Sequence, residues 1–310
     1  MMRKSLLWLS EQPRVFQFVR RNGLARSFAS RFVAGEDATT AVRAAQKLNT
    51  HGITASLDLL GESVSRDTEA AAARDEYLRM LDLIAGAKVQ ANVSVKLTQM
   101  GFDISEELCH ANITRILDRA LELKTFVRLD MESSAYTQRT LDFFANRLFD
   151  RYGSVTGVVI QSCLRRSAGD IDRLIEMQAR VRLCKGAYLE PPAVASPDKA
   201  DVDRSYVSLM ERLMTRGNYP GLATHDEKIL IHARAFAQAQ GIAPERYEFQ
   251  MLYGVRRDLQ HRLHADGYNM RVYIPFGTQW YPYLMRRLAE RPANVAFILG
   301  GVLRESVSRR

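Results

Sequence analysis

The chain has 310 residues, of which 46% are hydrophobic and 25% charged, as expected for a globular protein with a large core. The net charge of +9 is spread along the chain, and the usual RNA-binding and zinc-finger signatures are absent, which argues against a nucleic-acid partner. Three well-separated cysteines, Cys109, Cys163 and Cys184, argue against a disulfide framework and a closed zinc site. We therefore expect a cytoplasmic protein without a metal centre.

Residues 1–36 have the pattern of amphipathic helical pieces, with an apolar stripe that includes Leu6, Leu7 and Phe16. Such a segment packs on the protein body or touches a membrane surface, and we favour packing. No run approaches the roughly 20 apolar residues of a membrane span. We expect an N-terminal helical segment at 1–36 and one catalytic domain at 37–310, with peripheral contact at the inner face of the cell membrane left open.

From residue 37 onward, short apolar runs alternate with segments of helical period. The runs predict eight strands, at 53–60, 89–97, 126–131, 155–162, 180–186, 219–225, 247–252 and 270–276. Helical periodicity marks the segments 70–87, 106–123, 135–149, 203–217 and 228–241 between them. This alternation over about 250 residues predicts an α/β fold, a (βα)8 or TIM-like barrel. An open doubly wound sheet is the competitor, but no GxGxxG turn follows the first strand.

Nearly every predicted strand ends in a polar or ionisable side chain. This set comprises Glu62, Lys96, Asp130, Gln161, Arg182, Lys185, Thr224, His225, Gln250 and Tyr273. Barrel enzymes carry their chemistry at the carboxyl ends of the strands, so these side chains predict a site there. Lys96 is the most telling member, because it follows the apolar run Val93-Ser94-Val95, where an unpaired ammonium is costly to bury.

The chemistry of these residue types leaves several roles open. Lys96 suits a Schiff-base nucleophile or a fixed positive charge, and Asp130 suits binding of an ammonium group. Arg286 and Arg287 lie on the predicted last helix, three and four residues after Tyr283, so they can share a face with it. Such a pair suits a bidentate clamp on a carboxylate, while solvent-exposed charge is the simpler interpretation.

Six segments in collinear order resemble the proline dehydrogenase family, specifically its short monofunctional bacterial members. They are VSVKLTQMG (93–101), RLDMES (128–133), VRLCKGAYLEP (181–191), LATHD (222–226), FQMLYGVRRDL (249–259) and RVYIPFGTQWYPYLMRRLAERPAN (271–294). The resemblance implies a distorted (βα)8 barrel with N-terminal helices, FAD at the carboxyl ends of the strands and the last helix lying over the active site.

The resemblance also implies residue roles. Lys96, Asp130, Tyr273, Arg286 and Arg287 form the catalytic set, and Tyr188 and Tyr283 join them around the substrate. Lys96 would lie beside the flavin and stabilise its reduced, anionic form. The FAD contacts would be Gln161, Arg182, Lys185, Gly186, Ala187, Thr224, His225 and Gln250. Glu62 matches the acid that pairs with the first clamp arginine when the pocket closes.

The implied reaction is oxidation of L-proline to Δ1-pyrroline-5-carboxylate, the first step of proline catabolism to glutamate. A hydride would pass to the flavin and electrons onward to a quinone. A separate pyrroline-5-carboxylate dehydrogenase would act downstream, because nothing here resembles an aldehyde dehydrogenase. Three alternatives stay open: a hydroxyproline dehydrogenase, a barrel aldolase or lyase that uses Lys96 as a Schiff base, and a non-catalytic protein bound to a membrane.

Overall fold

Eight parallel strands form a closed barrel in chain order, with β8 pairing back onto β1. The computed structural model describes residues 29–290, and the side chains of 29–285. The strands are β1 (Thr54–Leu59), β2 (Ala91–Val95), β3 (Val127–Leu129), β4 (Thr156–Gln161), β5 (Arg180–Cys184), β6 (Gly221–Ala223), β7 (Glu248–Leu252) and β8 (Met270–Phe276). Each lies within its predicted range, so the barrel prediction is confirmed. Of the N-terminal helical segment predicted at 1–36, residues 1–28 fall outside the described residues.

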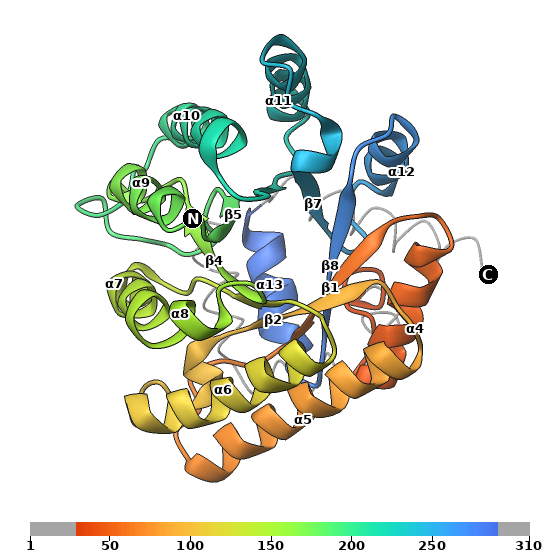
Figure 1. Cartoon of the computed structure of the whole chain (residues 1–310), viewed down its shortest axis with the longest axis vertical. Helices are drawn as coiled ribbons and strands as arrows, with labels where there is room; N and C mark the ends of the chain where they lie inside the picture. Colours follow the sequence, from red (N-terminus) through yellow and green to blue (C-terminus); the bar gives the residue numbers. More distant parts are fainter. Residues whose placement is uncertain (1–28, 291–310) are drawn as a thin grey trace, which may run out of the picture.

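A ring of helices surrounds the strands, and Figure 1 shows the barrel end-on with α13 behind its centre. The helices are α4 (Ala38–Asn49), α5 (Asp67–Gly86), α6 (Glu106–Glu122), α7 (Ser134–Phe143), α8 (Phe149–Tyr152), α9 (Ser167–Glu176), α10 (Lys199–Arg216), α11 (Glu227–Ala239), α12 (Arg257–Ala265) and α13 (Trp280–Glu290). The one-turn helices η1 (Leu97–Met100) and η3 (Pro244–Arg246) and the π-helical turn η2 (Phe144–Leu148) complete the set. Asp37, Ser105 and Asp198 cap α4, α6 and α10 through their side chains.

The two faces of the barrel sheet differ in chemistry. Outward-facing residues such as Leu57, Val93 and Leu129 are buried beneath the helices in one apolar core. The alternate residues point inward, and many are polar: Ser56, Asp58, Asn92, Ser94, Arg128, Asp130, Arg182, Glu248 and Gln250 are all buried. The strand pattern therefore gives the barrel a polar interior that runs along its axis.

Glycines make room for the long side chains that cross this interior. A Cβ atom at Gly157 of β4 would lie 2.6 Å from a terminal nitrogen of Arg128. A Cβ atom at Gly221 of β6 would lie 2.4 Å from the amide nitrogen of Gln250. Both distances are far shorter than van der Waals contact. Glycine at these positions is therefore a requirement of side-chain packing inside the barrel.

Helix α13 is held at the carboxyl end of the barrel by a second, smaller apolar cluster. This cluster joins Ala29 and Val33, Leu60 from the loop after β1, and Trp280, Tyr281, Tyr283, Leu284 and Met285 from α13. The turn into α13 needs Gly277, whose φ is +124°, and the Gly277 N–H donates to the Gly35 carbonyl at 2.9 Å. A last helix at the carboxyl end of the strands is thus confirmed.

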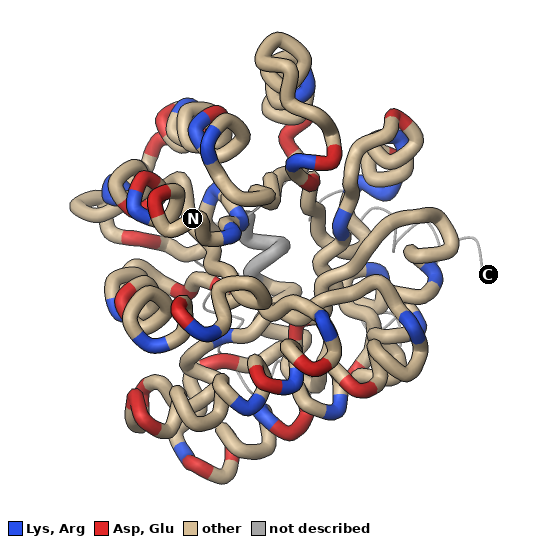
Figure 2. Tube along the Cα trace, viewed as in Figure 1, with Lys and Arg blue, Asp and Glu red and all other residues tan. Residues whose placement is uncertain are grey.

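Charge on the outside is mixed rather than segregated. Figure 2 shows Lys and Arg interleaved with Asp and Glu over the outer helices. Many of these groups pair, as Arg119 of α6 does with Asp82 of α5 at 2.6 Å. Among the helices that the structure describes, none is both long enough and apolar enough to cross a membrane.

Candidate active site

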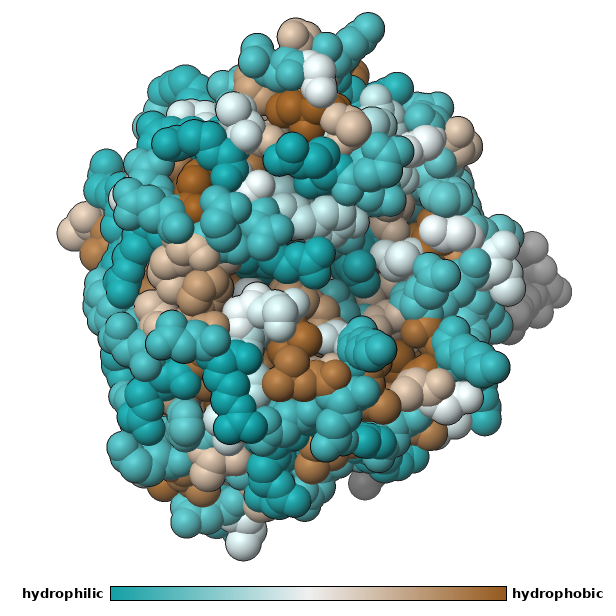
Figure 3. All heavy atoms as spheres, viewed as in Figure 1, coloured by the Kyte–Doolittle hydropathy of each residue, from teal (hydrophilic) through white to brown (hydrophobic). Residues whose placement is uncertain are grey.

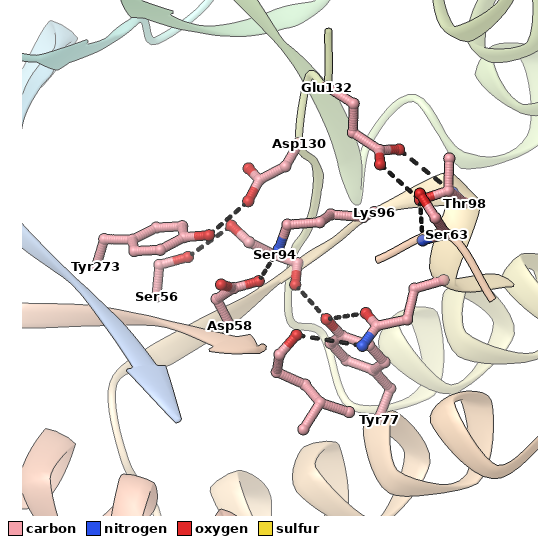
Figure 4. A network of polar contacts seen from close by, with 12 residues as sticks. Ser56, Asp58, Ser63, Tyr77, Ser94, Lys96, Thr98, Asp130, Glu132 and Tyr273 are labelled. Carbon is pink, nitrogen blue, oxygen red and sulfur yellow. Dashed lines mark hydrogen bonds and ion pairs between the residues drawn. The ribbon is translucent and has the colours of Figure 1, made fainter. Parts of the chain in front are cut away.

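A buried ion pair marks the carboxyl ends of β1 and β2. Asp58 on β1 lies beside Ser94 in the sheet register, and Lys96 follows β2 by one residue. The Lys96 ammonium donates to Asp58 Oδ1 at 2.7 Å, and the two residues are 9% and 1% exposed. Figure 4 shows the lysine pointing back across the strand ends toward the aspartate. The pair therefore places a positive charge at the mouth of the barrel.

The lysine stays charged despite its burial. Loss of water alone would lower the pKa of Lys96, but the negative field of Asp58, assisted by Asp130, raises that pKa above its usual value. A Schiff-base lysine needs a neutral amine, so this environment disfavours the aldolase alternative. Burial raises the pKa of Asp58, and Asp130 adds to the rise while Lys96 opposes it.

Asp130 lies at the centre of a second set of contacts, directly after β3. It accepts from a terminal nitrogen of Arg182 at 2.7 Å and from the Tyr273 hydroxyl at 2.7 Å. The same Arg182 guanidinium donates from Nε to Gln250 at 2.5 Å and lies 5.2 Å from the centre of the Tyr273 ring. Burial and the charge of Asp130 raise the pKa of Tyr273 well above its usual value, so the phenol stays protonated. Figure 4 shows Tyr273 directed at Asp130.

A third contact lies at the same rim. Glu132 accepts from the Thr98 hydroxyl at 2.5 Å and from the Thr98 N–H at 3.3 Å. Burial raises the pKa of Glu132 to about 6, hydrogen bonds from Thr98 oppose the rise, and Glu62 adds to it. Gln161 donates to the Glu132 carbonyl at 2.9 Å, which brings the end of β4 to this rim.

The predicted cofactor residues on β5 to β7 lie around the other side of the rim. Lys185, just beyond β5, forms ion pairs with Asp203 of α10 at 2.5 Å and Asp226 at 2.8 Å. The Thr224 hydroxyl accepts from the Asp226 N–H at 3.1 Å. His225 Nε2 accepts from the Leu252 N–H at 2.9 Å, which requires the proton of the neutral ring on Nδ1. These residues are fixed by contacts within the protein.

The remaining predicted residues lie on loops and on α13. Gly186, Ala187 and Tyr188 are half-buried on the loop that follows β5, and Gly186 has φ of +107°. Glu62 is half-buried on the loop after β1. Tyr283 is buried in the apolar cluster of α13. The clamp prediction rests on the side chains of Arg286 and Arg287, which lie outside the described part, although their backbone belongs to α13.

Sequence reasoning missed Asp58, Ser56 and Ser94, as well as Glu132 and Thr98 at the same rim. Asp58 received no role because it stands within an apolar strand, and its partner is 38 residues away. Ser56 and Ser94 share a hydrogen bond at 3.1 Å and both contact Arg182, at 3.4 and 3.1 Å. The period-two alternation of polar residues in Ser56-Leu57-Asp58 was the available signal, because it points both polar side chains into the barrel.

The donor set at this rim suits an organic cofactor better than a metal. Its side chains are mostly cationic, amide or hydroxyl groups. Within residues 29–285 no group of three or more His, Cys, Asp or Glu side chains is placed to hold a metal ion. Cys109, Cys163 and Cys184 are all thiols, and burial raises the pKa of each.

A closed (βα)8 barrel with buried ionisable groups at the carboxyl ends of its strands is the architecture of a barrel enzyme. Comparison with known proteins narrows this class. The proline dehydrogenase family model matches residues 41–299. A proline dehydrogenase of Deinococcus radiodurans is 41% identical over 305 residues, with 97% of this chain and 98% of that protein covered. Proline dehydrogenase 1 of Bacillus subtilis is 38% identical, with 98% and 100% covered.

Among solved structures, proline utilization A of Bdellovibrio bacteriovorus superposes with a TM-score of 0.80. The sequence identity is 24%, and the match covers 96% of this chain and 39% of that larger protein. This likeness bears on the fold alone. The chain belongs to the proline dehydrogenase family, whose members are flavin-dependent oxidoreductases.

Proposed function

We propose that this chain oxidises L-proline to Δ1-pyrroline-5-carboxylate with FAD as the hydride acceptor. Similarity over nearly the whole length to proteins named proline dehydrogenase carries the proposal. The buried Lys96–Asp58 pair at the barrel mouth supports it, because an ammonium held in its charged form suits a cofactor that gains negative charge on reduction. No observation favours hydroxyproline over proline.

The residues at the rim fit a flavin by their chemistry. Lys96 supplies a fixed cation, and Gln161 and Gln250 supply amide groups that both donate and accept, as flavin ring edges require. Lys185 supplies a second cation, held by two carboxylates, near the loop of Gly186 and Ala187. When bound, the flavin supplies the acceptor for the hydride. We assign Arg182, Thr224 and His225 to the same binding surface.

The substrate side of the site consists of tyrosines, an aspartate and the two arginines. We assign the proline carboxylate to Arg286 and Arg287 and the ring to Tyr188, Tyr273 and Tyr283. Asp130, which positions Tyr273 through its hydrogen bond, contributes the negative charge that faces the substrate nitrogen. Orientation of the substrate by such groups supplies a large part of the rate of a hydride transfer. Glu62, on the loop after β1, lies near Glu132, and from there it can close over the substrate.

The proposal extends to the surroundings of the reaction. Residues 37–310 form the catalytic domain, and 1–36 form a helical segment that packs on it. Reduced FAD passes its electrons to a membrane quinone, so we place the protein in the cytoplasm with peripheral contact at the inner face of the membrane. Water opens the cyclic imine product to the aldehyde, which a separate pyrroline-5-carboxylate dehydrogenase then oxidises to glutamate.

Anaerobic reduction tests this function directly. The purified protein should show a flavin absorbance band that bleaches when L-proline is added without oxygen. Hydroxyproline in a parallel experiment should bleach it at least about tenfold more slowly, as expected for a pocket that packs around an unsubstituted ring. A protein that carries flavin but is not reduced by either imino acid would overturn the proposal.

A further inference from the structure

A cavity lies at the amino-terminal end of the barrel, opposite the strand ends that carry Lys96 and Asp130. Its volume is about 580 Å³, within the range of small-molecule binding sites. Residues that precede or begin the strands line it, among them Asn92, Arg128, Arg180, Glu248 and Arg271. This end faces the viewer in Figures 1 to 3, since α13 lies behind it, and hydrophilic side chains predominate on the face.

The lining of this cavity carries an excess of positive charge. Its ionisable side chains are those of Lys124, Arg128, Arg180 and Arg271 and a single carboxylate, that of Glu248. Glu248 already forms an ion pair with Arg271, whose Nε donates to it at 2.8 Å. Arg128 and Arg180 form no ion pair with any residue that the structure describes, and instead lie 4.7 and 5.1 Å from the centre of the Phe126 ring. Among the described residues, the cavity therefore offers a carboxylate partner to Arg271 but none to Arg128 or Arg180.

Arg128 is the sharpest sign of a missing partner. It is 4% exposed, and its Nη1 donates to the carbonyls of Val158 at 3.2 Å and Arg180 at 2.6 Å. Its Nε is buried and has no acceptor, and the Oδ1 of Asn92, on the neighbouring strand, is buried and has no donor. A buried charged group without its full set of hydrogen bonds is costly. A ligand anion beside the guanidinium group would offset that cost.

The surroundings of Arg128 disfavour its charged form. Burial lowers its pKa strongly, Arg182 and Arg180 lower it further, and Glu248 opposes them. Because arginine keeps its proton in proteins, the result is a buried cation that the fields of Glu248 and Asp130 offset only in part. Gly157 makes room both for the Arg180 carbonyl and for this side chain, since a Cβ there would lie 2.2 Å from the former and 2.6 Å from Arg128 Nη1. Among the residues whose side chains are described, none forms an ion pair with this buried guanidinium group.

We propose that this cavity binds a small organic anion, with a phosphate or carboxylate group held between Arg128 and Arg180. An oxyanion in the cavity would lie against the Arg128 and Arg180 guanidinium groups that line it and offset the excess charge. Exposed residues at the rim, Gln90, Lys124 and Ser154, give the ligand a path from solvent.

The organic body of the ligand follows from size and lining. An inorganic oxyanion alone fills only a small part of about 580 Å³. Apolar groups of Ala91, Leu121, Phe126 and Val155 share the lining with the charged ones. A short carbon skeleton beside the oxyanion would cover this apolar surface. The ligand class is therefore a phosphorylated or multiply carboxylated metabolite.

Calorimetric titration of the flavin-loaded protein with inorganic phosphate, and separately with succinate, tests this proposal and separates the two anion types. We expect at least one of them to bind, with affinity falling as salt rises. Arg180→Gln should weaken that binding at least about tenfold, because one charge-assisted contact is lost. Arg139→Gln is the matched control, because that arginine also stacks on a phenyl ring, 4.3 Å from Phe102, but lies outside the cavity. It should leave the affinity unchanged.

A second variant guards against misfolding as an explanation. Asn92→Asp adds a carboxylate to the lining that Asn92 shares with Arg128, so it should raise the midpoint of urea unfolding while it abolishes anion binding. A purely structural cavity would not link those two changes in opposite directions. The proposal is overturned if neither anion binds, if Arg180→Gln binds as tightly as the original protein, or if Arg286→Gln removes the signal, which would assign it to the proline site.

Discussion

Substitution of Asp58 by Asn tests the role of the buried ion pair. The change keeps the shape and an acceptor oxygen but removes the charge that faces Lys96 at 2.7 Å. Both side chains are nearly inaccessible, at 2% and 11% exposure, so water cannot replace the lost partner. Breaking such a pair typically costs about 3–5 kcal/mol, because a buried charge is left alone. We expect Asp58→Asn to lower the free energy of unfolding by about that amount.

Urea unfolding of flavin-free protein measures this cost without the contribution of the cofactor. The matched control is Asp82→Asn, which breaks the exposed pair with Arg119 and should cost no more than about 1 kcal/mol. The double variant Asp58→Asn with Lys96→Gln replaces the charged pair by a neutral one and should regain most of the loss. A cost below about 1 kcal/mol for Asp58→Asn, or no recovery in the double variant, would refute the reasoning.

Three further outcomes follow from the structure. The pKa of Glu132 is raised from 4.5 to about 6, so the folded state binds more protons than the unfolded state between these values. The free energy of unfolding should therefore fall by up to about 2 kcal/mol as pH rises through that window. In urea titrations at pH 4.5 and 7, Glu132→Gln should show a smaller change in this free energy than the original protein does, and an equal change would contradict the argument. Gly157→Ala should cost about 1–3 kcal/mol by overpacking against the Arg180 carbonyl and the Arg128 side chain, whereas Gly169→Ala on α9, with nothing within 4 Å, should not destabilise. Equal thermal midpoints would contradict this packing account. Arg286→Lys should raise the KM for proline at least about tenfold with unchanged flavin content, because an ammonium cannot replace the planar fork, and parallel loss of flavin would count against the clamp.

The barrel could be predicted from sequence because its signal is local. Apolar runs such as 155–162 alternate with helical segments, and the structure places β4 inside that run. The strand ends were less certain, since β3 and β6 have only three paired residues each. A ladder ends where the neighbouring strand diverges, and this depends on the partner rather than on the strand's own residues.

The sequence predicts individual candidate residues but not the contacts between them. Lys96, Asp130 and Tyr273 are among the predicted site residues, whereas the pairing of Lys96 with Asp58 was not predicted, because it depends on the register of two strands. The sequence pattern gave even less indication of the amino-terminal cavity. Arg128 is one of many arginines in the sequence, and only its position beside Gly157 inside the barrel shows that it is buried without a carboxylate.

A crystal structure of the oxidised protein with a non-oxidisable carboxylate analogue of proline tests the central claim most directly. We predict the isoalloxazine ring at the carboxyl ends of the strands beside Lys96, with Arg286 and Arg287 on the analogue's carboxylate. A flavin bound elsewhere on the barrel, or two arginines directed into solvent, would contradict the proposed active site.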